Sequence, residues 1–149
     1  MKPLKKFEDY SKEGVVKKQS PDAERAKFLI TESNNNYQFL KELAKEKRIN
    51  HKNANSFIKM SYDVLMEMVR AKMLLNGFNA SGLGAHEAEV SYLRELDFSE
   101  YDIQFANQLR FFRNGIMYYG TILPEEYARK VLNFLNVMYP KLRKLCEIH

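Results

Sequence analysis

The chain has 149 residues, a formal net charge of +5 at pH 7 and 45% hydrophobic residues, with six glycines, four prolines and a single cysteine. This length predicts one compact domain with a single core, and the hydrophobic content excludes a mainly disordered chain. One cysteine excludes an internal disulfide. No apolar run is long enough to cross a bilayer and no apolar stretch follows the first lysines, so we expect a cytoplasmic protein without a membrane partner.

The first twenty residues are rich in lysine and contain fewer acidic residues. The charged residues of this segment are Lys2, Lys5, Lys6, Lys12, Lys17 and Lys18, with Glu8, Asp9 and Glu13. We interpret residues 1–20 as a basic N-terminal arm that is solvated and partly mobile, followed by a helical domain at residues 21–149. The alternative interpretation is an arm that adds phosphate contacts to a bound nucleic acid.

Two long helices are predicted after the arm. Ser20-Pro21-Asp22 is typical of a helix start, because Ser caps, Pro suits the first helical position and an acid favours the first turn. From there apolar residues keep a helical period to about Lys47. The second helix is predicted from near Asn53 to Asn76, where apolar residues recur at spacings of three and four. Gly77 stands where a C-terminal glycine cap belongs.

Three further helices complete the predicted fold. A shorter helix covers residues 85–96, and Ser99-Glu100-Tyr101-Asp102 resembles a capping box that opens a helix ending near Gly120. Pro124-Glu125-Glu126 starts the last helix, in which Pro140 is expected to cause a bend or a division. No segment alternates strictly as a strand does. The sequence therefore predicts an all-α fold, an antiparallel bundle of about five helices.

The helix between residues 99 and 120 contains the run Leu109-Arg110-Phe111-Phe112-Arg113-Asn114-Gly115-Ile116-Met117-Tyr118-Tyr119-Gly120. At about 100° per residue, the predicted core arc of this helix consists of Phe105, Leu109, Phe112 and Ile116. Arg110, Asn114 and Tyr118 follow at successive i, i+4 steps, so we expect their side chains to converge. Arg110 and Arg113 repel each other unless an anion, an acid or a partner helix compensates, and they are candidate phosphate ligands. Phe111 is large and apolar but lies off the core arc, which indicates a second buried surface.

This run resembles the signature helix of the HEPN family (higher eukaryotes and prokaryotes nucleotide-binding), in which an Arg, often followed by Asn, precedes a His. Arg113-Asn114 matches the first half of that pattern, and Tyr118 stands where the His is expected. The resemblance covers about residues 56–145. Residues 62–78 are similar to the family's long helix with its Gly-aromatic turn, and a glycine-bearing loop, a short helix, the Arg-Asn helix and a helix begun by Pro-Glu-Glu follow in the family's order.

The resemblance implies a HEPN-like bundle that forms a homodimer through the Arg110–Tyr119 helix and binds RNA or a nucleotide. In members that are metal-independent ribonucleases, the Arg holds the scissile phosphate and the Asn orients it, which gives these roles to Arg113 and Asn114. Tyr118 would handle protons, but a phenol with an ordinary pKa of about 10 is a poor base at neutral pH. Tyr119 adds a face on which a base can stack. We therefore expect binding through Arg110, Arg113 and Tyr119, with weak or lost cleavage.

A second hypothesis is a non-enzymatic interaction module, for example the partner of a small nucleotidyltransferase in a toxin–antitoxin pair, which is a role that other HEPN proteins have. Nothing in the sequence indicates a metal or cofactor site. His86-Glu87-Ala88-Glu89 lacks the second His of a zinc protease helix, and we interpret it as a helix start with acids that favour the dipole. The sequence leaves open whether His86 reaches the Arg113 cleft, and His51 and His149 are interpreted as turn and terminus residues.

Overall fold

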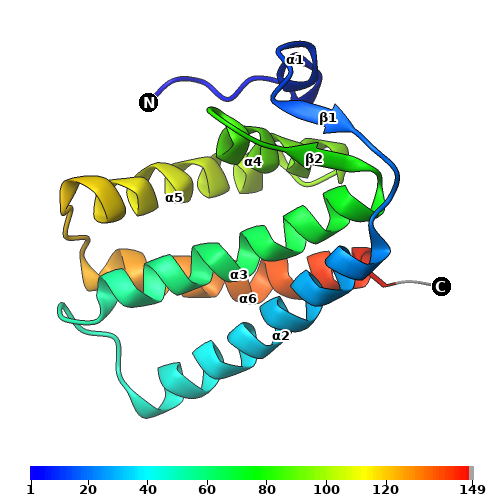
Figure 1. Cartoon of the computed structure of the whole chain (residues 1–149). Coiled ribbons are helices and arrows are strands. Elements are labelled where there is room, and N and C mark those ends of the chain that lie inside the picture. The colour runs from blue at the N-terminus through cyan, green and yellow to red at the C-terminus, as the bar shows by residue number, and fades with distance from the viewer. Residues whose placement is uncertain (148–149) are drawn as a thin grey trace.

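The computed structural model describes residues 1–147, which form six helices and one small two-stranded sheet (Figure 1). The elements are α1 (Phe7–Lys12), β1 (Val16–Lys18), α2 (Ala23–Glu46), α3 (Ala54–Leu75), β2 (Phe78–Ala80), α4 (Ala85–Glu95), α5 (Glu100–Tyr119) and α6 (Glu125–Leu145). The predicted all-α helical bundle is confirmed, and α2 to α6 correspond to the five predicted helices. α6 is one helix that continues through Pro140, so the predicted division is absent. His149 lies outside the described residues.

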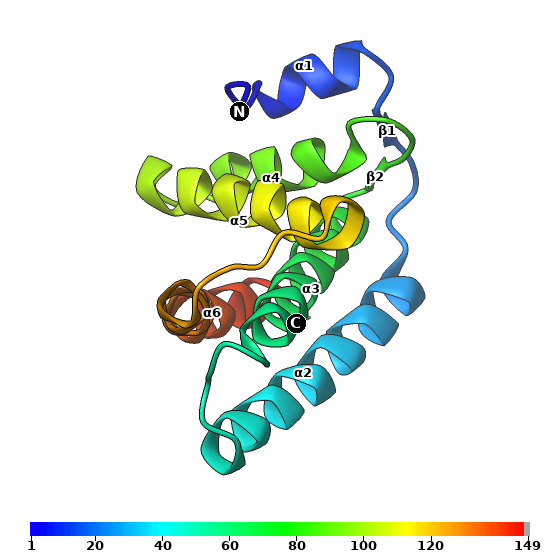
Figure 2. The same cartoon turned by 90° about the vertical axis from the view of Figure 1, so that its left-hand side faces the viewer.

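α3 is the central helix of the bundle. It packs against α2, α6, α4 and α5, and both Figure 1 and the view turned by 90° (Figure 2) place it between α2 and the pair formed by α4 and α5. A helix surrounded in this way needs apolar residues on several faces. Met66, Met68 and Met73 of α3 are fully buried and fill part of the core. None of the helices within residues 1–147 is both long enough and apolar enough to cross a membrane.

The buried face of α5 differs from the predicted core arc. Of the predicted arc only Leu109 is fully buried. The other members are half-buried, and the rings of Phe105 and Phe112 contact aromatic rings of α6. The buried residues of α5 are Ile103, Ala106, Asn107, Leu109 and Arg110. The prediction failed because it assumed that an arginine lies in solvent. An acidic side chain of α4, Glu87, pairs with Arg110 and makes its burial possible.

The N-terminal segment is packed on the bundle, and its interpretation as a solvated arm is corrected. Leu4, Phe7, Tyr10 and Val16 are buried, and the Phe7 ring centroid lies 4.8 Å from that of Tyr92 in α4. These apolar residues are spaced among the lysines, whose side chains remain in solvent. The segment is therefore anchored by ordinary hydrophobic burial, although its composition is that of a mobile terminus.

A short antiparallel pairing between β1 and β2, which the sequence did not reveal, ties the N-terminal segment to the end of α3. Val16 is opposite Ala80, and Lys18 is opposite Phe78. Three-residue strands are too short to produce a visible alternation. Next to the pair, the Gln19 amide donates to the Gly77 carbonyl at 2.9 Å.

Two predicted helix caps can be compared with the structure. Ser99 caps α5 as expected, because its Oγ accepts a hydrogen bond from the Asp102 amide at 3.2 Å. The cap of α2 is Asp22 rather than the predicted Ser20, and its carboxylate accepts from the Arg25 amide at 3.1 Å. The helix therefore begins slightly later than predicted.

Gly77 provides the first test of this fold. Its φ is +82°, and a Cβ at this position would lie 2.6 Å from the Gln19 carbonyl oxygen, whereas Gly82, with φ +77°, has nothing within 4 Å of a Cβ. We expect Gly77→Ala to lower the free energy of unfolding by roughly 3 kcal/mol and Gly82→Ala by only about 1 kcal/mol, since both are strained but only the first collides with backbone. Urea unfolding of both variants measures the difference. Equal losses would contradict the close approach at Gly77.

Candidate functional site

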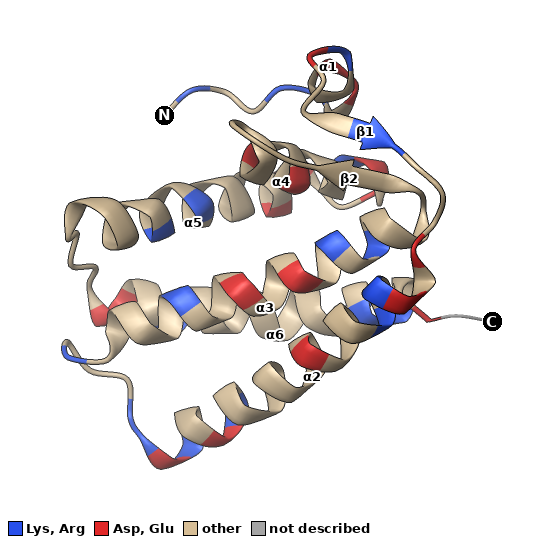
Figure 3. Ribbon diagram, viewed as in Figure 1, with Lys and Arg blue, Asp and Glu red and all other residues tan. Residues whose placement is uncertain are grey.

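A pocket of about 250 Å³ lies where α3, α4 and α5 meet. Figure 3 shows basic bands on α5 and both acidic and basic bands on the neighbouring α3. The residues that line the pocket are Tyr62, Asp63, Met66, Glu67 and Arg70 of α3, His86 of α4 and Arg113 of α5. Their positions on α3 follow the helical period, so the helix presents them as one stripe. His86 and Arg113 thus line the same pocket, a question that the sequence left open.

Arg113 is held in this pocket mainly by packing. Its guanidinium carbon lies 5.4 Å from the centroid of the Tyr62 ring, a distance typical of a cation–π contact. Its Nη2 lies 3.5 Å from Asp63 Oδ1, which is the long limit of a hydrogen bond. Its Nε is buried and has no hydrogen-bond partner among the described residues. A guanidinium has five N–H donors, so most of the binding capacity of Arg113 is unused.

Tyr62 contributes a second unpaired polar group. Its hydroxyl is buried and has no hydrogen-bond partner within residues 1–147. Burial, together with the negative charge of Glu89, raises the pKa of Tyr62 well above its ordinary value, so the phenol stays protonated at neutral pH. Most buried polar groups in folded proteins are paired. Of the four buried side-chain polar atoms without a partner within residues 1–147, two therefore lie beside this pocket, on Arg113 and Tyr62, and the other two belong to Ser61 and Tyr127.

Glu89 does not line the pocket but contacts two residues that do, Arg70 and His86. Its side chain is only 4% exposed and receives two hydrogen bonds from Arg70, from Nε at 2.7 Å and from Nη2 at 3.1 Å. His86 Nδ1 lies 3.4 Å from the Glu89 Oε1. Burial alone would raise the pKa of Glu89, but the contact with His86 and the hydrogen bonds from Arg70 lower it below its ordinary value. Glu89 is therefore a buried carboxylate that stays charged and orients both neighbours.

Two further acids, Asp63 and Glu67, line the pocket from α3. Burial raises the pKa of the Asp63 carboxyl, and the positive charge of Arg113 lowers it only in part. Burial and then the charge of Asp63 raise the pKa of Glu67. Asp63 is half-exposed and its contact with Arg113 is long, so it can turn toward solvent when an anion approaches the guanidinium.

Arg110 lies elsewhere, and its predicted role at the same site is corrected. It is buried, its Nη1 lies 3.1 Å from Glu87 Oε1, and its Nε donates to Asn107 Oδ1 at 3.1 Å. It lines a separate hollow beside the N-terminal residues. The physical reason is that Arg110 is at the centre of the buried face of α5, with its charge balanced by Glu87. Within residues 1–147, the side-chain hydrogen bonds of Arg110 go to Asn107 and Glu87 and not to Asn114 or Tyr118.

The other predicted residues follow Arg113 on α5 but do not line its pocket. Asn114 is half-buried, whereas the side chains of Tyr118 and Tyr119 are 70% and 84% exposed. The last turn of α5 ends at Gly120, and the exposed Ile122 follows. Of the predicted site residues, only Arg113 belongs to the pocket between α3, α4 and α5.

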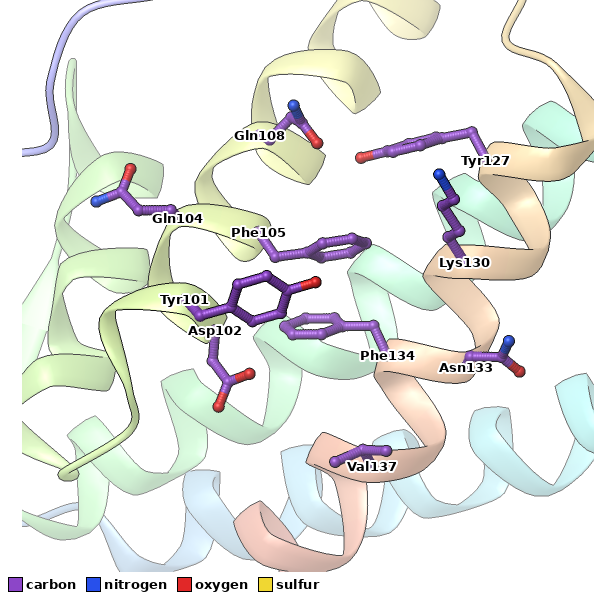
Figure 4. A pocket seen from close by; sticks show the side chains of 10 residues that line it. All are labelled: Tyr101, Asp102, Gln104, Phe105, Gln108, Tyr127, Lys130, Asn133, Phe134 and Val137. Atoms are coloured by element: carbon purple, nitrogen blue, oxygen red, sulfur yellow. The ribbon is translucent and has the colours of Figure 1, made fainter.

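A larger hollow of about 720 Å³ lies between α5 and α6 (Figure 4). The rings of Phe105 and Phe134 lie side by side in it, with centroids 4.3 Å apart, and Tyr101 and Tyr127 lie next to them. Lys130 is the one basic residue of its described lining, and no histidine or arginine contributes. This hollow is larger and largely apolar, and its polar lining includes Lys130, Asp102 and the Tyr127 hydroxyl, which is buried and has no hydrogen-bond partner within residues 1–147.

Sequence reasoning missed the residues that α3 contributes to the Arg113 pocket. Asp63, Glu67 and Arg70 form a charged stripe along a largely apolar helix, and that stripe was the available signal. Glu89 was interpreted only as an acid that favours the helix dipole. Its pairing with Arg70 joins two helices and leaves no local pattern in the sequence.

Comparisons of the chain with models of protein families, with curated proteins and with solved structures give no match. Within residues 1–147, no group of three or more His, Cys, Asp or Glu side chains is placed to hold a metal ion. The function is therefore argued from the chemistry of the pocket.

The buried pair of Glu89 and Arg70 gives a test of the site's construction. We expect Glu89→Gln to lower the free energy of unfolding by about 3 kcal/mol at pH 7, because it leaves Arg70 without its counter-charge. Since the folded state lowers the pKa of Glu89, its contribution is complete above the ordinary value of 4.5 and is lost as pH falls through the lower, folded value.

Urea unfolding between pH 7 and pH 3 measures this contribution. The difference between wild type and Glu89→Gln should be constant down to about pH 5 and then shrink. Glu100→Gln is the control, because Glu100 pairs with Arg94 at 2.7 Å but is exposed, and its loss should have little effect. If the difference in unfolding free energy between wild type and Glu89→Gln grew as the pH fell, Glu89 would not have a lowered pKa in the folded state.

Proposed function

We propose that this protein binds RNA or a nucleotide by holding a phosphate at Arg113, and that it acts as a HEPN-like homodimer with weak or lost metal-independent ribonuclease activity. The observation that carries the proposal is the unused binding capacity of Arg113, a half-buried guanidinium that is held in a pocket by the Tyr62 ring. A guanidinium presents paired N–H donors that match two phosphate oxygens. The hydroxyl of Tyr62 is a further donor in the same place.

The charges around the pocket favour Arg113 over the other arginines as the phosphate ligand. Arg70 and Arg110 are each engaged by a carboxylate at 3.1 Å or less, Glu89 and Glu87 respectively. Arg113 has only the long contact with the half-exposed Asp63. An incoming phosphate therefore competes with a weak partner at Arg113 and with strong partners at the other two.

The size of the pocket favours a phosphate within a larger molecule. About 250 Å³ is below the usual range for pockets that enclose a whole drug-sized ligand, roughly 300–1,000 Å³. A phosphate and the atoms bonded to it fit such a space, while the rest of the ligand remains outside. The net charge of +5 favours the approach of a polyanion. RNA is such a polyanion, and each of its phosphates is part of a larger molecule.

Tyr118 supports the expectation of weak or lost cleavage by the signature helix itself. Its side chain is largely exposed and does not line the pocket of Arg113. A phenol is also a poor base at neutral pH. α5 thus supplies a phosphate ligand without supplying an effective proton acceptor beside it.

The exposed end of α5 supports the homodimer. The large apolar side chains exposed there are Phe111, Met117, Tyr118, Tyr119 and Ile122. A group of exposed apolar residues on one segment is typical of an interaction surface. A two-fold dimer would place the same segment of both chains face to face.

The same exposed group supports the alternative function, an interaction module for another protein such as a nucleotidyltransferase. It is separate from the residues that line the Arg113 pocket, so a protein partner would not require that pocket. Binding of RNA and formation of a homodimer distinguish the two proposals.

The RNA proposal is tested with a fluorescein-labelled single-stranded RNA and fluorescence anisotropy at low salt. We expect Arg113→Ala to weaken binding at least tenfold, or about 1.4 kcal/mol, because it removes a charged ligand of the phosphate. Lys6→Ala removes an exposed charge from the N-terminal segment and should change the Kd less than threefold. An equal loss of RNA affinity in both variants would indicate nonspecific attraction between a basic protein and RNA. Unaltered binding in Arg113→Ala would contradict the proposal.

The dimer is tested by light scattering at tens of micromolar, where we expect twice the chain mass of 17.6 kDa. Phe111→Asp should shift the protein to the monomer, since a charge would be desolvated at the interface. Phe28→Asp is the matched control, because Phe28 is also exposed, at 62% against 48% for Phe111, but lies on α2. A monomeric wild-type protein, or dissociation by Phe28→Asp alone, would contradict a dimer through α5.

A further inference from the structure

We infer that His86, oriented by Glu89, is the proton-transfer residue of the Arg113 pocket, and that the substrate is an RNA strand cleaved by its own 2′-hydroxyl. This inference rests on the proposed binding of RNA at Arg113. The proton transfer is thus assigned to a residue of α4, whereas the sequence pattern of α5 predicts Tyr118 for this role.

The contact between His86 and Glu89 is the first observation. His86 Nδ1 lies 3.4 Å from Glu89 Oε1, and the carboxylate is itself fixed by two hydrogen bonds from Arg70. A fixed, charged carboxylate beside Nδ1 favours the tautomer with its proton on that nitrogen. The other nitrogen, Nε2, then carries the lone pair. In many enzymes a carboxylate orients the imidazole that acts as general base in this way.

Access to the imidazole is the second observation. The His86 side chain is 51% exposed, whereas Glu89 is 4% exposed, so a substrate can reach the base but not its orienting partner. His86 also lines the pocket that contains Arg113. A phosphate bound by Arg113 would therefore place the adjacent ribose near the imidazole.

The fold holds His86 in place. Gly84 caps α4 in the left-handed conformation, with φ 88°, and His86 follows in the first turn of the helix. One turn later, Glu89 binds Arg70 of α3 through two short hydrogen bonds. The position of the imidazole is thus set by a buried contact between two helices rather than by a loop, as a catalytic group requires.

The other titratable groups that line the pocket are poorer bases. The pKa of Tyr62 is raised by burial, so its phenol holds its proton. Burial raises the pKa of Asp63 and Glu67 of α3, and Asp63 is already in contact with Arg113, the residue that would hold the phosphate. Among these groups only imidazole has one nitrogen that accepts a proton and a second that can donate one.

The reaction balances without any further reactant. Nε2 of His86 takes the proton of the 2′-hydroxyl, and the 2′-oxygen forms a bond to the adjacent phosphorus. The bond from phosphorus to the 5′-oxygen breaks, and the departing 5′-oxygen takes a proton from the imidazolium, which regenerates the neutral imidazole. The products are a 2′,3′-cyclic phosphate and a free 5′-hydroxyl. Arg113 stabilises the negative charge that develops on the phosphate oxygens.

The test uses the full-length chain, EDTA, and a labelled DNA oligonucleotide that contains one ribonucleotide. Cleavage is followed by gel and binding by anisotropy. We expect the wild type to cut at the ribonucleotide and His86→Gln to cut at least 100-fold more slowly with its Kd changed less than threefold, as the loss of a general base predicts. Tyr118→Phe should cut at the wild-type rate, and Arg113→Ala should bind at least tenfold more weakly and cut more slowly than the wild type.

A second readout separates chemistry from structure. Free imidazole added to His86→Ala should restore part of the cleavage rate, which a residue with only a structural role would not allow. Wild-type binding without cleavage would overturn this inference and leave the proposed RNA binding intact. Cleavage that persists in His86→Gln and is lost in Tyr118→Phe would assign the proton transfer to Tyr118 instead. Failure of the wild type to bind RNA would overturn both proposals.

Discussion

The buried ion pair between Arg70 and Glu89 is the interaction on which the rest of the site depends. It joins α3 to α4 through hydrogen bonds of 2.7 and 3.1 Å, and the carboxylate is almost completely removed from solvent. Removing Arg70 would leave a buried carboxylate, and removing Glu89 would leave a partly buried guanidinium without its partner, so the two helices are held in one arrangement. The same carboxylate orients His86, which lies in the first turn of α4. One contact therefore stabilises the fold and places a titratable group at the pocket.

A second ion pair positions α5 in a similar way. Arg110 is buried against Glu87 of α4, and this contact sets the rotation of α5 about its axis. Because Arg113 follows three residues later, it lies close to the same face and reaches α3, where the Tyr62 ring packs against it. The two arginines of α5 thus have different tasks. Arg110 fixes the helix, and Arg113 keeps hydrogen-bonding capacity because its partner is only the half-exposed Asp63.

Much of the fold could be predicted from the sequence because its signals are local. Periodic apolar residues gave the extents of α2 to α6, Ser99 identified the start of α5, and Gly77 marked the end of α3. The orientation of α5 could not be predicted, since a neighbouring acid on another helix determines whether an arginine is buried. The packing of the N-terminal segment was missed for a related reason: Phe7 meets its partners only in three dimensions.

The candidate site was predictable only in part. As for the fold, the missed features depend on contacts between residues that are far apart in the sequence. Arg113 has a recognisable sequence context, but the role of its neighbours depends on which helices approach it. Tyr118 follows Arg113 by five residues, and at 100° per residue this separation turns its side chain well away from the pocket. His86 is distant in sequence but near in space, because Glu89 holds α4 on α3. A helix that supplies the phosphate ligand therefore need not supply the base, provided that a neighbouring helix is fixed firmly enough to do so.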